Sequence, residues 1–455
     1  MIQTLDRNRL KRQIGLRTAI ALIVGEVIAI GIFLTPAGMA KSLGSPFLIL
    51  SVWLVMAGMA LCGALCYGEL AARFPEAGGG YVYLREAYGR PVAFMYGWMT
   101  LLVMDPGLTA ALAVGLASYI GYILLLSATG KKLVAVGAIV LVAAVNVRGV
   151  RFGSWFVRWL TVLKLGLLGF VIFWGFAFQL GNWSNFTPFF AQRSNSSPIL
   201  AAIAAGMIGA FFSFGGWWDL TKLGGELRNP GQTLPKALAY GVAIVAIVYI
   251  LTSFVFLYLV PLGQVSSGET FAAQAGEVLF GRVGGLLFSL IVIIAVLGSL
   301  TAVIMSAPRV YFAMARDRLF FPAIASVHPR FETPARATVL QAALATLLVV
   351  LGTFNQIVSY FVFVVVIFIA LTVAGLFIVR RKYPKPSEYL TPGYPVTPVI
   401  FLTLIVVLLI LLGVNNPLQA FLGVGVVSLS LPVYYLVFRS GMRVSQPEVR
   451  TEEPN

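Results

Sequence analysis

Charged residues are scarce in this sequence. Asp, Glu, Lys and Arg make up 11% of its 455 residues, whereas hydrophobic residues make up 59%. A soluble domain carries about a quarter charged residues, so this composition excludes an ordinary soluble protein. Apolar runs of about 20 residues recur from end to end, and each is long enough to cross the hydrocarbon core of a bilayer. The sequence therefore predicts a multi-pass membrane protein.

Histidine and cysteine are almost absent as well. The only histidine, His328, falls in a loop, which leaves no histidine for a metal cluster or a catalytic triad in the membrane. Cys62 and Cys66 lie one helical turn apart in an apolar run, so neither a disulfide framework nor a disulfide-linked partner subunit is expected. The sequence has no nucleophile beside a base and no phosphate-binding loop, which argues against an enzyme and an ATP-driven pump. We predict no cofactor and no metal site.

Twelve apolar segments have the length of membrane helices. Backbone groups in lipid must be satisfied within their own segment, so runs this long are helices rather than barrel strands. No A-x-A-like cleavage site follows the first segment, which is therefore expected to be retained. Predicted spans 1 to 12 are 18–40, 45–70, 91–125, 132–148, 152–179, 200–222, 236–260, 284–310, 335–353, 356–380, 395–414 and 417–438.

Basic residues outnumber acidic residues by 32 to 16. With the N-terminus in the cytoplasm, nearly all of them fall on cytoplasmic loops and ends, as the positive-inside rule requires. The exceptions are Lys164, within span 5, and Lys41, Lys131, Lys132, Arg193 and Arg282, on the outside. The charge thus predicts cytoplasmic N- and C-termini, and no nucleic acid is needed as a partner.

Two spans contain glycines in the middle of an apolar run. Span 1 reads "VGEVIAIGIFLTP" over 24–36 and is expected to break around Ala29-Ile30-Gly31. Span 6 reads "GAFFSFGGWWDLTKLGG" and is expected to break around Gly215-Gly216. A broken helix at membrane depth is tolerated only where its backbone lines a cavity or is buried in protein. The alternative is that these glycines serve close packing between helices.

The two breaks stand at matching positions of two halves. Each opens a group of five spans, and because five is odd, the second group enters the membrane from the opposite side. Paired breaks in inverted halves indicate a transporter's binding site near the bilayer midplane. The predicted organisation is a cytoplasmic N-terminus (1–17), a first five-helix repeat (18–179), a second, inverted repeat (200–380), two additional helices (395–438) and a cytoplasmic tail (439–455).

Broken helices suit a zwitterionic ligand. Free N–H groups at the start of one half-helix attract a carboxylate, and free carbonyls at the end of another attract an ammonium group. An α-amino acid carries both groups close together. The sequence therefore predicts an amino acid as the substrate.

Several sequence blocks resemble those of the amino acid–polyamine–organocation (APC) superfamily. They are "GEVIAIGIFLTPAGM" in span 1, "YGELAARFPEAGGGYVYLREAYG" after span 2, "FFSFGGWWDLTKLGGELRNPGQTLPKAL" from span 6, "APRVYFAMARDRLFFP" ending span 8 and "PGYPVTP" before span 11. The sequence looks most similar to the L-type amino acid transporters and the serine/threonine-exchanger-like permeases. The resemblance implies the inverted five-plus-five, leucine-transporter-type fold, with substrate bound between spans 1, 3, 6, 8 and 10.

The resemblance also implies substrate-binding residues. Ala29, Ile30 and Gly31 would offer backbone N–H groups to the substrate carboxylate, whereas Phe212, Ser213, Phe214 and Gly215 would supply carbonyls and pocket walls. Phe212 matches the aromatic residue that closes over substrate in relatives, although it could instead only fill core space. Relatives usually carry Gly-Ser-Gly or Gly-Thr-Gly where this chain has Ala-Ile-Gly, and often a small polar residue at Trp218. Both departures would narrow or reshape the pocket.

Lys164 stands out because a charge in mid-membrane needs partners. It matches the lysine of sodium-independent relatives, whose amine occupies the place of a sodium ion, and Ser299 is its expected neighbour on span 8. Glu26 allows three interpretations: an ion pair with Lys164, proton coupling, or a water-facing side chain. Asp105, before Pro106, either faces the central cavity or caps the kinked backbone there.

Three charged residues near the end of span 6 remain. Asp219 and Lys222 lie one helical turn apart and are expected to form a local pair rather than a binding site. Glu226 follows in the loop and is assigned to cytoplasmic gating or loop structure, because substrate at the midplane could not reach it.

These features predict a secondary amino acid transporter in the cell membrane that works by alternating access. It is expected to be sodium-independent, to favour neutral substrates, and to act as an exchanger or with proton coupling. Glu26 and Asp105 keep a cationic amino acid or polyamine permease open. A passive channel is the alternative from another class, but paired, aromatic-rich breaks within one chain fit occlusion better than an open pore.

Overall fold

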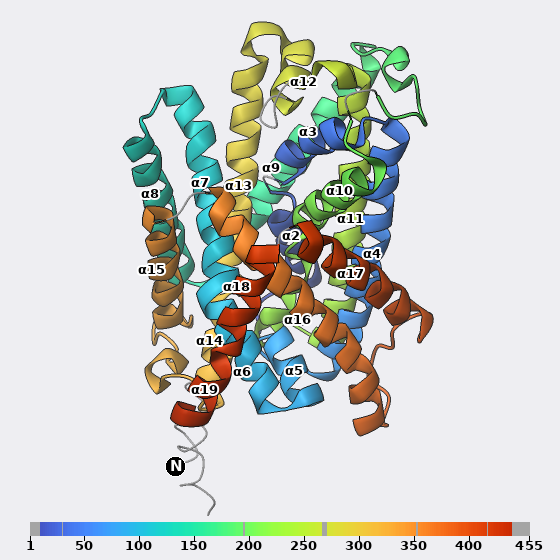
Figure 1. Cartoon of the computed structure of the whole chain (residues 1–455). Coiled ribbons are helices and arrows are strands. Elements are labelled where there is room, and N and C mark those ends of the chain that lie inside the picture. Colours follow the sequence, from blue (N-terminus) through green and yellow to red (C-terminus); the bar gives the residue numbers. More distant parts are fainter. Residues whose placement is uncertain are drawn as a thin grey trace, which may run out of the picture.

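The chain folds into a bundle of helices (Figure 1). The computed structural model describes residues 10–29, 31–193, 196–265, 271–351, 354–415 and 417–438. Ile30, the first nine residues and the predicted tail at 439–455 lie outside this part of the chain. Within it, nine helices are long and apolar enough to cross a membrane, which confirms an all-helical, multi-pass membrane protein.

These nine helices coincide with nine of the predicted spans. They are α4 (Pro46–Arg73), α6 (Arg90–Met99) continuing through η1 (Thr100–Met104) into α7 (Asp105–Leu124), α8 (Ala128–Val147), α9 (Val150–Ala177), α10 (Ile199–Phe214) with η3 (Trp217–Lys222), α11 (Pro230–Leu259), α13 (Gly284–Ser306) with α14 (Pro308–Arg316), α16 (Phe354–Lys382) and α17 (Val396–Asn415).

The three other predicted spans correspond to shorter helices. Span 1 is divided into α2 (Leu16–Val27) and α3 (Gly31–Leu43), span 9 is α15 (Ala335–Leu351), and span 12 is α18 (Pro417–Ser428) with α19 (Ser430–Val433) and η8 (Tyr434–Phe438). A count of twelve membrane crossings, the two inverted groups of five and the two additional helices therefore remain predictions.

Span 1 is interrupted where the glycine pattern indicates. The α2 helix ends at Val27, and Ile28 leaves the helical region with a ψ of 83°. The amide of Ala29 donates to Val27 O at 2.8 Å in a tight turn, and α3 begins at Gly31. The chain thus makes two half-helices instead of one continuous span.

Span 6 is interrupted in a similar way. The α10 helix ends at Phe214, and Gly216 has a φ of +103°, a left-handed conformation that residues with a side chain rarely adopt. The chain then continues as a 3₁₀ helix, η3, instead of an α-helix. This change of helix type turns the chain just after the Gly-Gly pair.

The interrupted helix α2 lies at the centre of the bundle. It contacts α9, α11, α13 and η3, while α3 packs against α10 (Figure 1). The α8 and α15 helices pack together against α7 at one side, and α16 and α17 cover another side. Short helices lie at opposite ends of the bundle, α12 (Phe271–Phe280) at one and α5 (Gly80–Tyr88) at the other.

Candidate functional site

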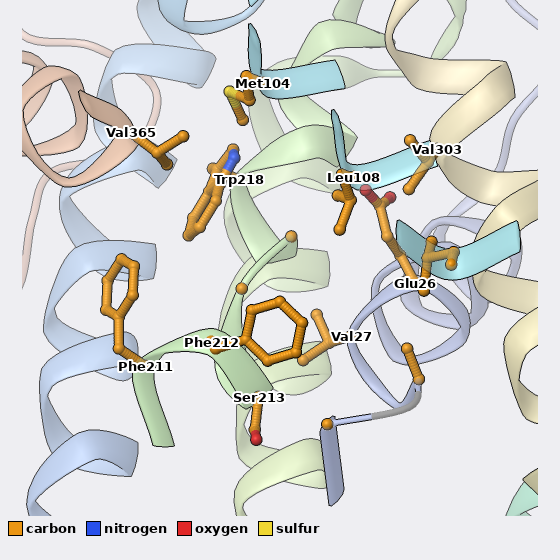
Figure 2. A pocket seen from close by; sticks show the side chains of 15 residues that line it. Glu26, Val27, Met104, Leu108, Phe211, Phe212, Ser213, Trp218, Val303 and Val365 are labelled. Carbon is orange, nitrogen blue, oxygen red and sulfur yellow. The ribbon is translucent and has the colours of Figure 1, made fainter. Parts of the chain in front are cut away.

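A cavity lies where the two interrupted helices meet (Figure 2). Its walls come from both sides of each interruption and from η1, α7, α13 and α16. These elements belong to predicted spans 1, 3, 6, 8 and 10. The lining residues are Glu26, Val27, Ala29, Gly31, Met104, Leu108, Leu112, Phe211, Phe212, Ser213, Gly215, Gly216, Trp218, Val303 and Val365.

The two interruptions touch each other directly. A Cβ atom on Gly31 would lie 2.7 Å from the Cα of Ser213, so only glycine permits this approach of α3 to α10. The Ser213 hydroxyl lies 2.7 Å from the hydroxyl of Thr35 on α3. The Tyr249 hydroxyl, from α11, lies 2.7 Å from Val27 O and 2.8 Å from Ser213 O. One tyrosine thus links the last turn of α2 to the last turn of α10.

The ends of the half-helices give the cavity its polar character. The first N–H groups of α3, beginning at Gly31, have no acceptor within their own helix, and they carry the positive end of its dipole. The last carbonyls of α10, up to Phe214, form the negative end of that helix. Because α3 and α10 meet at Gly31 and Ser213, one small molecule with both charges can reach both ends.

Most of the remaining wall is apolar. Figure 2 shows the Phe212 ring beside Val27, with the indole of Trp218 on the other side of the cavity. The rings of Trp218 and Phe211 are stacked, with their centroids 6.3 Å apart. The buried indole N–H of Trp218 has no hydrogen-bond partner in the described residues. Such a wall suits an uncharged side chain and leaves one donor available to a ligand.

Lys164 supports the interruption of span 1 from α9. Its side chain is 0% exposed, and Nζ donates to Gly25 O at 2.8 Å, to Ile28 O at 2.6 Å and to Ala295 O at 2.9 Å. An ammonium group has three N–H donors, so these carbonyls satisfy all of them. The hydroxyl of Ser299, on α13, donates to Gly25 O at 2.8 Å. Lys164 and Ser299 therefore meet at the end of α2, as the sequence suggested.

The ion pair between Glu26 and Lys164 is absent from the described residues. Lys164 binds the carbonyls of Gly25 and Ile28, on the face of α2 that is turned to α9 and α13. Successive residues of an α-helix point about 100° apart, which turns Glu26 away from that face. Its carboxyl lines the cavity instead, between Leu108 and Val303 in Figure 2, and Oε1 has no hydrogen-bond partner.

Asp105 does not line the cavity. It lies in the first turn of α7, fully buried, and its Oδ1 accepts a hydrogen bond from Lys222 Nζ at 2.8 Å. The expected local pair is also present, with Lys222 Nζ 2.9 Å from Asp219 Oδ1. The Tyr311 hydroxyl lies 3.3 Å from Asp105 Oδ2. Asp105 is thus neither a cavity residue nor a backbone cap, because Lys222 draws its carboxylate toward η3.

One other predicted substrate residue, Phe214, falls outside the cavity wall. Phe214 packs instead against Trp53 on α4 and Tyr249 on α11, with ring centroids 6.0 Å and 5.1 Å away. Its side chain belongs to the core, because the last turn of α10 directs it away from α3. Ile30 lies outside the described residues, so its role stays a prediction.

A second set of contacts joins the chain segments below the cavity, at the predicted cytoplasmic end. The buried Glu226 carboxylate accepts hydrogen bonds from Arg309 Nε at 2.6 Å and Nη2 at 3.2 Å. Nearby, Ile14 pairs with Leu227 as an isolated bridge, with Arg228 N donating to Ile14 O at 2.9 Å. These contacts tie the segment before α2 to the segment after η3, as the gating assignment of Glu226 would require.

In the described part of the chain, no group of three His, Cys, Asp or Glu residues is arranged to hold a metal ion. Cys62 and Cys66 lie within α4 as free thiols, the first partly buried and the second buried. Sequence reasoning missed Tyr249, as it missed cavity-lining residues such as Leu108 and Val365. The signal was present, because a tyrosine hydroxyl inside an apolar span needs a partner, and the carbonyls of a broken helix can supply it.

The chain matches known transporters along almost its whole length. The family model described as "Amino acid permease" matches residues 14–438. The serine/threonine exchanger SteT of Bacillus subtilis is 29% identical over 434 residues, which cover 94% of this chain and 98% of that protein. The mouse b(0,+)-type amino acid transporter 1 is 28% identical, covering 97% and 92% of the two chains. The human large neutral amino acids transporter small subunit 2 is 27% identical, over 94% of this chain and 80% of that protein.

The family model spans far more than half of the chain, and all three relatives are transporters or exchangers of amino acids by name. These matches agree with an all-helical fold that has two interrupted helices around one cavity. The chain belongs to the amino acid permease family, within the L-type transporter and serine/threonine exchanger group of the APC superfamily.

Proposed function

We propose that this chain is a sodium-independent secondary transporter that carries neutral amino acids across the cell membrane by alternating access. The observation that carries the proposal is the meeting of two interrupted helices at one cavity. The substrate carboxylate would bind the N–H groups at the start of α3, and its amine the carbonyls at the end of α10. The direct approach of Gly31 to Ser213 supports this arrangement.

The proposed preference for neutral substrates rests on the cavity wall. Apart from Glu26, the lining side chains are uncharged, and most are aliphatic or aromatic. An uncharged substrate side chain loses little solvation there, whereas a charged one needs a partner. Phe212 and Trp218 would face the side chain of the substrate from two sides.

Sodium independence is proposed from the surroundings of Lys164. The carbonyls of Gly25, Ile28 and Ala295 form a small set of hard oxygen ligands at the end of α2, and the Lys164 ammonium group contacts all three. A positive charge thus already stands at the interrupted helix. Uptake is expected to be unchanged when choline replaces sodium.

A cationic substrate is the second candidate. Glu26 presents an unpartnered carboxylate oxygen to the cavity, and this oxygen could receive the amine of a basic amino acid or a polyamine. The two candidates predict opposite orders of preference for labelled leucine and labelled lysine.

Purified protein in liposomes tests the proposal. Labelled leucine, serine, lysine and glutamate are offered to empty vesicles and to vesicles preloaded with unlabelled amino acid. We expect saturable uptake of leucine or serine that preloading stimulates and that sodium does not affect. Uptake that rises linearly with concentration would indicate a passive channel instead, and faster uptake of lysine would favour the cationic candidate.

A glycine pair in α3 provides a matched comparison. Gly31→Ala places a Cβ 2.7 Å from the Cα of Ser213, so the contact between the interruptions must open. Gly38→Ala makes the same chemical change on the same helix, where nothing lies within 4 Å. We expect uptake to fall at least about tenfold in the first variant, the effect of roughly 1.4 kcal/mol, and to persist in the second. Equal uptake by both would contradict the proposed site.

A further inference from the structure

Two buried polar atoms in the cavity wall have no hydrogen-bond partner among the described residues. They are Glu26 Oε1 and the indole Nε1 of Trp218, and each of these side chains is only 6% exposed. The one hydroxyl in the wall, on Ser213, is already paired with Thr35 Oγ1 and with Gly209 O. A buried polar group without a partner is unfavourable, and native structures contain few of them. Two such atoms in one cavity therefore indicate a ligand that pairs with both.

Both atoms belong to the same part of the cavity. The Glu26 side chain rests against Gly216, where a Cβ would lie 3.2 Å from Glu26 Cγ, and Trp218 follows this glycine by two residues. In Figure 2 the nitrogen edge of the Trp218 ring is directed toward Met104, and the Glu26 carboxyl toward Leu108. Met104 and Leu108 both line the cavity and are four residues apart, which is about 6 Å along a helix axis. The donor and the acceptor thus face neighbouring turns of span 3.

The two atoms have opposite requirements. The Trp218 N–H can only donate a hydrogen bond, and a Glu26 carboxylate can only accept one. A ligand that satisfies both must bring one acceptor and one donor. A carboxamide brings both on one planar group, with its C=O for Trp218 and its NH₂ for Glu26. With hydrogen bonds of about 2.9 Å at each end, such a group joins atoms roughly 6–8 Å apart.

Other substrate side chains satisfy these atoms less well. An ammonium or guanidinium group would pair with Glu26 but has no acceptor for the Trp218 N–H. A carboxylate would accept from Trp218 but would be repelled by Glu26. An aliphatic side chain leaves both atoms unpaired, and the single oxygen of a hydroxyl reaches across less distance than an amide does. The wall therefore distinguishes an amide from a cationic side chain as well as from an apolar one.

We propose that Glu26 and Trp218 form a subsite for a side-chain carboxamide, so that glutamine and asparagine are the preferred neutral substrates. The inference rests on the proposed function, in which the charged groups of the substrate bind at the ends of α3 and α10. From there the substrate side chain runs toward η3 and α7, which supply Trp218 and Leu108 to the wall. No bond of the substrate changes.

Hydrogen bonds give this subsite more selectivity than apolar contacts would. When a substrate lacks the amide, the two protein atoms stay buried and unpaired, and such sites reject the analogue strongly. An ordinary hydrogen bond changes affinity about two- to tenfold, and one to a charged group changes it more. Glutamine should therefore bind at least about tenfold more tightly than methionine, which has a side chain of similar length.

The test uses the intact protein in liposomes preloaded with unlabelled leucine. Uptake of labelled leucine is measured against increasing glutamine, methionine, glutamate or lysine outside. We expect glutamine to halve the uptake at a concentration at least about tenfold lower than methionine, glutamate or lysine does. Labelled glutamine should itself be exchanged. Methionine or lysine that competes as well as glutamine would overturn the proposal.

Variants locate the subsite. Trp218→Phe keeps an aromatic ring but removes the N–H, and Glu26→Met removes the acceptor. The preference for glutamine over methionine should fall about two- to tenfold in the first and at least about tenfold in the second, whereas methionine should still be exchanged. Trp159→Phe and Glu277→Met are the matched controls, because both residues are exposed. An equal preference in the subsite variants and the controls would contradict the assignment.

The wild-type measurement decides the question even if the variants do not fold. It also separates the two levels of the argument. Exchange of leucine without a preference for glutamine over methionine refutes the carboxamide subsite alone. Absence of any amino acid exchange refutes the proposed function as well.

Discussion

Lys164 and Lys222 are both buried near the same cavity, but their surroundings differ in kind. Lys164 donates to three carbonyl oxygens, which are neutral and cannot change their protonation. Lys222 lies between two carboxylates, and a third carboxyl group, Glu26, is buried against Gly216, which precedes η3. The first lysine thus carries the only charge among its partners, and the second is outnumbered by its partners.

The two lysines therefore differ in how their contacts depend on pH. The contacts of Lys164 fix the end of α2 at any pH at which the lysine is charged. The partners of Lys222 are carboxyl groups, which lose their charge when they bind a proton, so the contacts between α7 and η3 can change with pH.

The largest effect is expected for Lys164→Met. The substitution removes the lysine donor from the carbonyls of Gly25, Ile28 and Ala295, and the one Ser299 hydroxyl, which lies within 3.4 Å of all three, can serve only one of them at a time. A buried polar group without a partner costs about 1–3 kcal/mol. We expect the free energy of unfolding to fall by roughly 2–6 kcal/mol for the two carbonyls left without a side-chain donor. Leucine uptake should become undetectable. Thermal unfolding in detergent and a liposome assay measure the two effects.

The pH dependence of this loss sharpens the comparison. Because the orphaned groups are carbonyls, which do not titrate, the variant should not regain stability as the pH falls from about 7 to about 5. A variant that regains stability in acid would show that a carboxyl group takes part in the Lys164 site, against the contacts described above.

A somewhat smaller effect is expected for Lys222→Met. Removing one partner of a buried ion pair costs about 3–5 kcal/mol, since it leaves uncompensated charge. Here the lost stability should partly return as the pH falls, because protonation of Asp105 removes unpaired negative charge. Thermal unfolding of the variant and the wild type across the pH range measures this recovery.

A double variant checks the cause. Asp105→Asn with Lys222→Met removes one carboxylate together with the lysine, so its destabilisation should be less than the sum of the two single changes. Additive effects would mean that the cluster is not held together by charge compensation. A Lys222→Met variant whose instability does not depend on pH would mean the same.

The Lys164 site was largely predictable from the sequence, and the Lys222 cluster only in part. A lone lysine in mid-span must find partners, and the carbonyls of a broken helix are the obvious ones. Asp219 and Lys222 are neighbours in sequence, but Asp105 is 117 residues away from Lys222, and no local pattern brings these two together. Tertiary packing of α7 against the rest of the bundle decides that pairing.

Glu26 shows that the burial of a side chain is easier to predict from sequence than the neighbours toward which it points. Its position in an apolar run predicted a buried carboxyl, and it is buried. Whether it meets Lys164 or faces the cavity depends on the rotation of α2, because a step of one residue turns a side chain by about 100°. The breaks themselves were predictable from glycine, whereas α2, α3 and α15 are shorter than the apolar runs from which their spans were inferred.

The smallest effects are expected from removing one hydroxyl in each cluster. Ser299→Ala removes a donor to Gly25 O, but Lys164 Nζ still donates to the same atom at 2.8 Å. Tyr311→Phe removes the hydroxyl 3.3 Å from Asp105 Oδ2 and 2.5 Å from Gln341 Oε1, and the amide oxygen then loses that donor. Thermal unfolding of both variants at neutral pH and in acid compares them directly.

Ser299→Ala should cost about 0.5–1.5 kcal/mol, the net value of an ordinary hydrogen bond, because no acceptor is left without a partner. Tyr311→Phe should cost about 1–3 kcal/mol, since the Gln341 amide oxygen and the Asp105 carboxylate share its one hydroxyl hydrogen and both lose it. Only Tyr311→Phe should become less destabilising in acid. A protonated Asp105 carries no charge, so it depends less on a hydrogen bond from Tyr311. If Ser299→Ala were the more destabilising change and the more sensitive to pH, the distinction drawn here would be wrong. The Lys164 site would then be the one that titrates, and the Lys222 cluster the one that does not.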